Sequence, residues 1–135
     1  MNDIVGGPNP TNIPIAMANF TAQSPTYFGM IAAMDDLSTA RPRPNSEIVG
    51  RAQGLFGATS LEEIGLYMTF SFVFTSGNIM PYWTQPFFNE HRELPIVGCS
   101  GVYRLGHGSA LLNTVSYDSA LGDDVVQYNV VVLHY

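Results

Sequence analysis

"IGLYMTFSFVF" (64–74) is the stretch that most clearly predicts the secondary structure of this chain. Its large apolar side chains recur at every second position, from Ile64 to Phe74, whereas Thr69 and Ser71 lie among the positions between them. Successive side chains of a β-strand point to opposite sides, so a period of two predicts a strand with one apolar face. The stretch therefore indicates a β-protein in which similar runs lie on both sides of it.

Short apolar runs rich in β-branched and aromatic residues do flank this stretch, and glycine and proline separate them. No segment keeps the 3.6-residue period of an amphipathic helix, and "SLEEIG" (60–65) is interpreted as a turn. About eight short strands with few helices predict a sandwich or a closed barrel. Six of these expected strands span 26–36, 47–58, 64–74, 94–101, 102–118 and 124–135.

The last strand favours the barrel over the sandwich, because it is apolar on both faces. Val126 and Tyr128 lie on one side of it, and Val125 and Val131 lie on the other. A sandwich with a solvated outer face has no need of this pattern, whereas a barrel with an apolar interior and an oligomeric exterior does. We therefore expect a single barrel domain over residues 1–135.

The composition excludes several classes of protein. The net charge is −6 and the chain has five arginines but no lysine, so it lacks the basic stripe of a nucleic-acid-binding protein. No apolar run approaches the ~20 residues of a membrane span, and the polar start "MNDIVGG" is no signal peptide. Only 12% of the residues are charged and 46% are apolar, which suggests that another copy of the chain covers part of the surface.

Metal and cofactor sites are also not expected. The single cysteine, Cys99, permits no internal disulfide. His91 and His107 are near it in the sequence, but the spacing fits no known zinc finger. No haem or flavin motif is present either, so we expect neither a metal nor a cofactor.

Five blocks of sequence closely resemble the dirigent protein family of plants, in the same order and from near the first residue to the last. They are "DIVGGPNPT" (3–11), "VGRAQG" (49–54), "MTFSFVFTSG" (68–77), "RELPIVGCSGVYRLGHG" (92–108) and "VVQYNVVVLHY" (125–135). The resemblance implies an eight-stranded antiparallel β-barrel, usually a homotrimer, that is secreted to the plant cell wall. The family is longer between the third and fourth blocks, so one strand around residues 78–91 is expected to be shortened or replaced.

The resemblance also implies three alternative functions. The best-known members direct the coupling of two monolignol radicals, of the coniferyl alcohol type, into one stereoisomer of a lignan such as pinoresinol; a separate laccase or peroxidase makes the radicals. Other members resemble dehydratases that work through a quinone methide, as in pterocarpan formation. A third possibility is a non-catalytic, phenolic-binding protein of the cell wall. Coupling requires orientation in an apolar cavity, and a buried carboxylic acid of raised pKa can protonate a quinone methide.

Three residues are catalytic candidates. Asp3 matches a family aspartate linked to catalysis, with a frayed terminal acid as the alternative. Arg92 matches a family arginine that contacts substrate, with a weak surface ion pair as the alternative. Asp35 and Asp36 are adjacent in an expected strand and must point to opposite faces. We expect Asp35 to face the interior, aided by Arg51 as a substrate-binding residue, with a role in a turn equally open.

The remaining candidates concern binding and modification. Gln85 lies seven positions before Arg92, where relatives often have an acid; it can hydrogen-bond but supplies no mobile proton, which weakens the case for a two-acid site. Asn19 begins an N-glycosylation sequon, in agreement with secretion. Core packing is the more frequent explanation for any single aromatic residue. The further substrate-binding candidates are Tyr27, Phe56, Tyr103, His107 and Val126.

Overall fold

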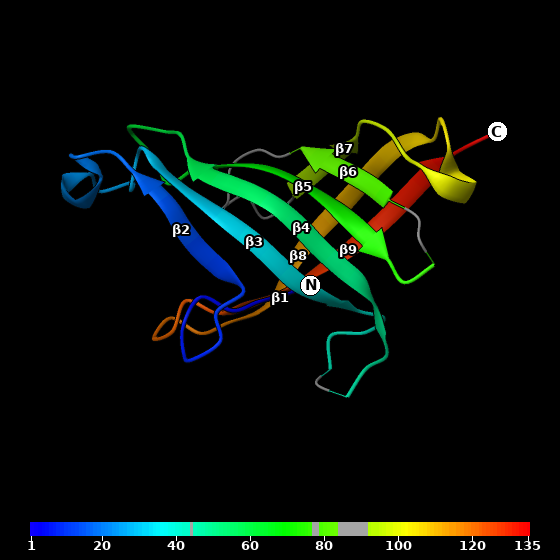
Figure 1. Ribbon diagram of the computed structural model, residues 1–135, viewed down its shortest axis with the longest axis horizontal. Helices are drawn as coiled ribbons and strands as arrows, with labels where there is room; N and C mark the ends of the chain where they lie inside the picture. Colours follow the sequence, from blue (N-terminus) through cyan, green and yellow to red (C-terminus); the bar gives the residue numbers. More distant parts are fainter. Residues whose placement is uncertain (44, 77–78, 84–91) are drawn as a thin grey trace.

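The computed structural model describes residues 1–43, 45–76, 79–83 and 92–135, with the backbone alone at Asp3 and along 79–83. These ranges contain nine strands and two short 3-10 helices (Figure 1). The strands are β1 (Asn2–Asp3), β2 (Asn12–Met17), β3 (Met30–Thr39), β4 (Ile48–Ala58), β5 (Leu66–Phe74), β6 (Ile79–Trp83), β7 (Arg92–Ile96), β8 (His107–Tyr117) and β9 (Asp124–Leu133). The helices are η1 (Thr21–Gln23) and η2 (Gly101–Tyr103), and no helix of the described residues has the length and apolarity to cross a membrane.

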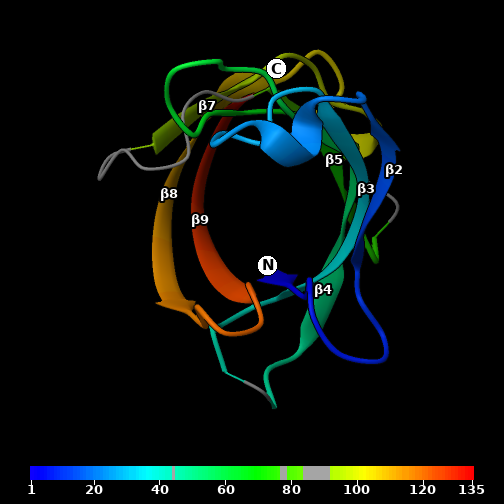
Figure 2. The same cartoon turned by 90° about the vertical axis from the view of Figure 1, so that its left-hand side faces the viewer.

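The strands form one antiparallel sheet in the order β1-β9-β8-β7-β6-β5-β4-β3-β2. The sheet curls until β1 pairs with β3 as well as with β9, because Asn2 lies opposite both Leu37 and Val125. In Figure 2 the strands β3 and β4 lie on the opposite side of the curled sheet from β8 and β9. The expected all-β antiparallel class is therefore confirmed, whereas the expected eight-stranded barrel is not, because the sheet of the described residues has nine strands.

The additional strand arises at the N-terminal end. Both β1 and β2 lie along the same edge of β3: Asn2 is opposite Leu37, and β2 runs from Asn12, opposite Met34, towards the start of β3. The loop 4–11 leaves the sheet between them, so one edge of β3 receives two short partners. At β6 a strand is retained, and it pairs with β5 along its length. The expectation of a shortened or replaced strand concerns 78–91, of which 78 and 84–91 lie outside the described residues, so it stays a prediction.

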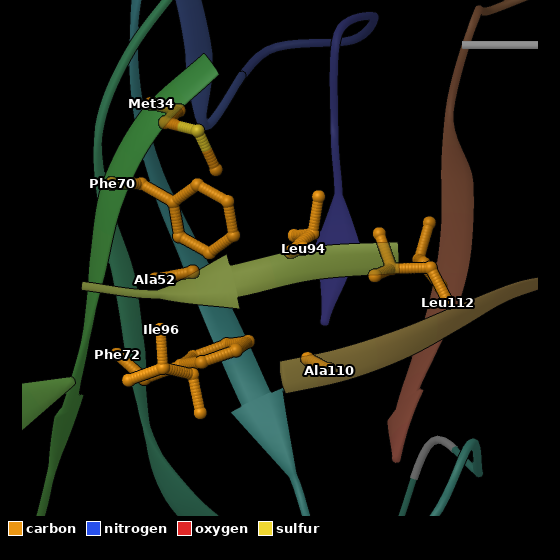
Figure 3. Close-up of a cluster of buried hydrophobic side chains, with 9 residues drawn as sticks. Met34, Ala52, Phe70, Phe72, Leu94, Ile96, Ala110 and Leu112 are labelled. Atoms are coloured by element: carbon orange, nitrogen blue, oxygen red, sulfur yellow. The ribbon is translucent and has the colours of Figure 1, made fainter. Parts of the chain in front are cut away.

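The core lies on the inner face of the curved sheet. The alternation predicted for 64–74 is confirmed over β5, since Phe70 and Phe72 are buried on one face whereas Tyr67 and Thr69 on the other face are exposed. The ring of Tyr128 on β9 meets Phe72 edge to face, with the centroids 5.0 Å apart. The buried cluster comprises Met34, Ala52, Phe70, Phe72, Leu94, Ile96, Ala110, Leu112 and Val126 (Figure 3). Burial of these side chains from β3, β4, β5, β7, β8 and β9 holds the two sides of the sheet together.

Gly54 on β4 is required because the neighbouring strand passes very close to it. A Cβ atom there would lie 2.1 Å from the backbone oxygen of Thr69, which a side-chain rotation cannot relieve. We expect Gly54→Ala to lower the free energy of unfolding by about 2 kcal/mol, as for other overpacked sites. Gly98→Ala is the control, since a Cβ there meets no atom within 4 Å. Urea unfolding of both variants measures the difference, and equal stabilities would contradict the expectation.

Candidate functional site

Asp36 is the buried acid at one end of the core. The inner face of β3 carries Met34, then Asp36, then Ser38, and the carboxyl group of Asp36 has 0% exposure. Its Oδ1 atom accepts hydrogen bonds from the Oγ1 atom of Thr11 and from the Nδ2 atom of Asn12, the latter at 3.0 Å. Its Oδ2 atom is buried and has no hydrogen-bond partner among the described residues. Burial outweighs the two hydrogen bonds and raises the pKa of Asp36 to about 6.

A second buried acid, Asp124, lies across β1 from Asp36. It begins β9, two residues before the core residue Val126, and is 6% exposed. Burial raises the pKa of Asp124 to about 6, although the guanidinium of Arg92 and the amino group at Met1 act in the opposite direction. The charge of Asp124 in turn raises the pKa of Asp36, so the two carboxyl groups are within electrostatic reach of each other.

Arg92 is the cation at this end of the inner face. It begins β7, on the same side of the strand as the buried Leu94, and is half-buried. Its Nη2 atom donates to the Oγ1 atom of Thr114 on β8, at 2.5 Å. We call Asp36, Asp124, Arg92 and Thr114 the carboxyl cluster, because four strands bring these polar groups together at the edge of an apolar core.

A pocket of about 260 Å³ opens beside the carboxyl cluster. Ser38 and Val126 belong to its lining, and each lies two residues from an acid on the same face of its strand. The aromatic side of the pocket is formed by Phe72, Phe74 and Tyr128. A flat, mostly apolar guest can therefore lie against aromatic rings while it approaches the two acids.

The expectation that Asp35 faces the interior was wrong. Its side chain is 50% exposed on the outer face of β3, where its carboxylate accepts hydrogen bonds from Arg51 and Gln53 on β4. The hydrogen bond from Arg51 is the largest cause that lowers the pKa of Asp35. Arg51 is therefore also on the outer face, away from the interior. Asp36 takes the inward position because Met34 and Ser38 share its face, and the strand period leaves Asp35 outside.

The other expected residues are distributed over the molecule. Tyr27 and His107 are exposed, Tyr27 at 58% in the turn before β3 and His107 on the outer face of β8. Phe56 and Tyr103 pack against the core, and Tyr103 also meets the ring of His134 edge to face. Tyr27 and His107 therefore do not line the pocket beside the carboxyl cluster.

Four further candidates from the sequence remain to be placed. Val126 lies in both the core and the pocket lining. The backbone of Asp3 pairs with that of Asp124, which brings the chain at Asp3 to the carboxyl cluster. Gln85 lies outside the described residues. Asn19 is exposed between β2 and η1 and is accessible to modification.

Two members of the cluster, Asp36 and Asp124, were not predicted as site residues. For Asp124 the sequence holds a usable signal: the expected inner positions 126, 128, 130 and 132 extend back by one step to 124. For Asp36 the signal is ambiguous, because both faces of "MIAAMDDLSTA" (30–40) mix apolar and polar residues. Only the pairing of β3 with its neighbours decides which acid is buried.

The arrangement is suited to moving protons in an apolar surrounding. Acids whose pKa is about 6 exchange protons readily near neutral pH, and Arg92 favours the ionised form of the acid beside it. Within the described residues, no three or more His, Cys, Asp and Glu side chains gather as metal ligands would.

Comparison with known proteins places this chain in one family. The family model for dirigent-like proteins matches residues 1–133. The chain is 40% identical to dirigent protein 21 of Arabidopsis thaliana, over 98% of this chain and 73% of that protein. It is 38% identical to pterocarpan synthase 1 of Glycine max, over 99% and 75% of the two chains. The chain therefore belongs to the dirigent family.

Solved structures agree with this assignment. The structure of the pterocarpan synthase dirigent protein GePTS1 superposes with a TM-score of 0.91 at 34% identity, covering 99% of this chain and 85% of that one. The pterocarpan synthase dirigent protein PsPTS1 gives a TM-score of 0.88 at 35% identity, covering 99% and 90%. The similarity in sequence and in fold extends over nearly the whole chain.

Proposed function

We propose that the protein removes water from a phenolic benzylic alcohol and forms a quinone methide, with Asp36 as the general acid. The buried pair of acids is the observation that supports this proposal. Departure of a hydroxyl group as water needs a proton at that oxygen, and an acid whose pKa is about 6 holds one at mildly acidic pH, where an ordinary aspartate has lost it. Relatives at 34 to 38% identity are named pterocarpan synthases.

The step conserves protons and involves no oxidation. Asp36 gives its proton to the benzylic hydroxyl, the carbon–oxygen bond breaks, and water leaves. The phenol on the same ring loses its proton to the carboxylate of Asp124, whose ionised form Arg92 favours. The electron pair of that phenol forms the quinone methide. A second hydroxyl of the substrate then attacks it to close a ring and gives its proton to the carboxylate of Asp36, while Asp124 returns a proton to the phenolic oxygen. Asp36 is not in the pocket lining, whereas Ser38, two residues along the same face, is. We propose that the Ser38 hydroxyl, which has no hydrogen-bond partner among the described residues, relays the proton when substrate is bound.

The size of the pocket favours one substrate molecule over two. Small-molecule sites are roughly 300–1,000 Å³, and this pocket, at about 260 Å³, is slightly smaller than the lower limit of that range. Dehydration and ring closure need a single molecule, whereas radical coupling needs two.

Stereoselective coupling of monolignol radicals to a lignan such as pinoresinol is the second candidate. Two buried acids favour it, because the coupled product is a bis-quinone methide and each half can take a proton from one acid. The radicals must then come from a separate laccase or peroxidase. The aromatic rings of Phe70, Phe72 and Tyr128, which meet edge to face, would orient the flat phenols.

Two assays with the purified protein distinguish these functions. In the first, an isoflavanol with a phenol conjugated to its benzylic alcohol is incubated without any oxidant, and we expect a ring-closed product lighter by one water. In the second, coniferyl alcohol and laccase are used with chiral chromatography, and we expect racemic pinoresinol. One enantiomer in the second assay without turnover in the first would establish coupling instead. Binding of phenols without either activity would contradict both functions and support a cell-wall binding protein.

We further propose, from the family resemblance, a homotrimer secreted to the apoplast and glycosylated at Asn19. Apolar side chains exposed on the outer face of β8 and β9, such as Leu111, Val131 and Leu133, support contact between copies. Light scattering that gives the mass of a monomer would contradict the trimer. Protein made in plant cells whose mobility does not change on deglycosylation would contradict the modification.

A further inference from the structure

We propose that Thr11 and Asn12 are positioning residues that fix the proton of Asp36 on its Oδ2 atom. This inference rests on the proposed function, in which that proton is transferred to substrate. Its basis is the hydrogen-bond geometry around the carboxyl group, in which Oδ1 accepts two hydrogen bonds and Oδ2 accepts none from the described residues.

Both donors point at the same oxygen. The hydroxyl of Thr11 and the amide of Asn12 donate to Oδ1, which then has both of its lone pairs occupied. A protonated carboxyl group carries its hydrogen on one oxygen, and Oδ1 has no room for it. The proton therefore belongs on Oδ2, which has no partner among the described residues and stays available for transfer.

The hydroxyl of Thr11 donates mainly to Asp36, because its other acceptor, the backbone oxygen of Ile4, is 3.4 Å away and the bond to Asp36 is much shorter. The backbone N–H of Ile4 donates to Thr11 Oγ1 at 3.0 Å, which uses the acceptor side of the hydroxyl. The backbone of Thr11 is fixed on both sides: its N–H donates to the oxygen of Ile4 at 2.8 Å, and its oxygen accepts from the N–H of Asp35 at 2.9 Å. The donor is therefore in place before any substrate binds.

The loop that carries Thr11 is itself tied to the start of β9. The carboxylate of Asp123 accepts hydrogen bonds from the backbone N–H groups of Val5 at 2.8 Å and Gly6 at 2.9 Å. Asp123 directly precedes Asp124 in the sequence. One short segment thus holds the loop that orients the first acid and also supplies the second acid.

The charged groups around Asp36 act alongside these hydrogen bonds. Asp124 on β9 raises the pKa of Asp36, whereas the amino group at Met1 lowers it, and Arg92 acts on Asp124. The hydrogen bonds from Thr11 and Asn12 lower the pKa of Asp36 against the effect of burial. Removal of one of them should therefore make Asp36 a weaker acid, with a higher pKa.

The test compares Thr11→Val with Thr11→Ser in the whole protein. The ionisation of Asp36 is followed by NMR of ¹³C-labelled aspartate carboxyl groups, with the signal assigned from its loss in Asp36→Asn. In Thr11→Val we expect the midpoint of Asp36 to rise by about one pH unit, a roughly tenfold change. The alkaline limb of kcat/KM for the isoflavanol should move by the same amount. Thr11→Ser keeps the hydroxyl and should restore both.

Thr21→Val is the matched control, since it removes another buried threonine hydroxyl, which donates to the oxygen of Phe28 before the start of β3. It should lower stability without moving the midpoint of Asp36. An unchanged midpoint in a folded Thr11→Val would overturn the positioning role, whatever the activity. A midpoint that rises while the limb of kcat/KM stays in place would overturn Asp36 as the acid, and the positioning role with it. If Thr11→Val does not fold, a shifted midpoint in Thr11→Ser would overturn the hydroxyl as the determinant.

Discussion

Asp36→Asn should convert the isoflavanol about 100- to 10,000-fold more slowly than the unmodified protein, because loss of a general acid has effects of this size. Asparagine is nearly the same shape as aspartic acid, and its Oδ1 atom can accept the same hydrogen bonds from Thr11 and Asn12. The substitution therefore removes the mobile proton and preserves the local structure. Single-turnover measurements under saturating substrate separate the chemical step from binding.

Asp35→Asn provides a matched control in the adjacent position. It makes the same chemical change on the outer face, where the lost ion pair with Arg51 is exposed and contributes at most about 1 kcal/mol. Its turnover should stay within about twofold of the unmodified protein, which is the size of effect expected for a surface change without contact to substrate. If both variants lost activity equally, the loss could not be assigned to the buried position of Asp36, and the proposed role of Asp36 would be contradicted. If both kept full activity, Asp36 would have no catalytic role.

Arg92→Met extends the test to the second acid. In the proposed step, Arg92 favours the ionised form of Asp124, which takes the phenolic proton. Without that cation the pKa of Asp124 should rise, so the acidic limb of the pH–rate profile should move to higher pH. Chemical rescue by guanidinium, measured in the same assay, would restore the limb, and an unmoved limb would contradict this role.

The alternation of side chains made part of the fold predictable from sequence. In 64–74 one face is uniformly apolar, so the strand and its buried side follow from a period of two. The same is true of the last strand, where Val126 and Tyr128 were expected on one face and do share the interior. Such patterns are local, and a local rule is sufficient to predict them.

The number of strands and the inward acid depended on pairings between distant segments. One edge of β3 receives β1 at Leu37 and β2 further along, which separates the N-terminal block into two strands. The sequence of residues 2–17 alone does not indicate where the pairing with β3 passes from β1 to β2. The neighbouring acids at 35 and 36 are chemically identical, and a shift by one residue exchanges their faces. Only the register with Arg51 of β4, opposite Leu37, fixes Asp35 outside.

The family resemblance singled out Arg92 and Asp3, whose roles in function stay predictions. Arg92 and the backbone of Asp3 do lie at the carboxyl cluster, and both were expected from matched blocks. The aromatic and histidine candidates were chosen because their side chains can line a pocket, but the same residue types also occur on protein surfaces. His107 shows the difficulty, because its strand was predicted and its exposed face was not.

The free energy of unfolding should increase as the pH falls from about 7 to about 4. The pKa of each buried acid is raised from 3.8 to about 6 by folding. Between these values the folded protein keeps protons that the unfolded chain has released, so the free energy of unfolding decreases as the pH increases. Each group contributes about 3 kcal/mol over this window, because one pH unit of pKa difference corresponds to about 1.4 kcal/mol.

Asp36→Asn should abolish the share of this dependence that belongs to Asp36. At pH 7 the variant should be more stable than the unmodified protein by about 3 kcal/mol, since it buries no charge at that position. Near pH 4 the two should be equally stable, because the acid is then neutral and resembles the amide. Asp35→Asn should have the opposite effect on stability. Folding lowers the pKa of Asp35, so its ionised carboxylate stabilises the folded protein at neutral pH, and this stabilisation is lost as the pH falls through the folded pKa. The variant should therefore be less stable than the unmodified protein at pH 7. Urea unfolding at several pH values measures how the free energy of unfolding of each variant depends on pH. If Asp36→Asn were less stable than the unmodified protein at pH 7, the ionised carboxylate of Asp36 would be stabilised in the folded state, and the prediction would be wrong.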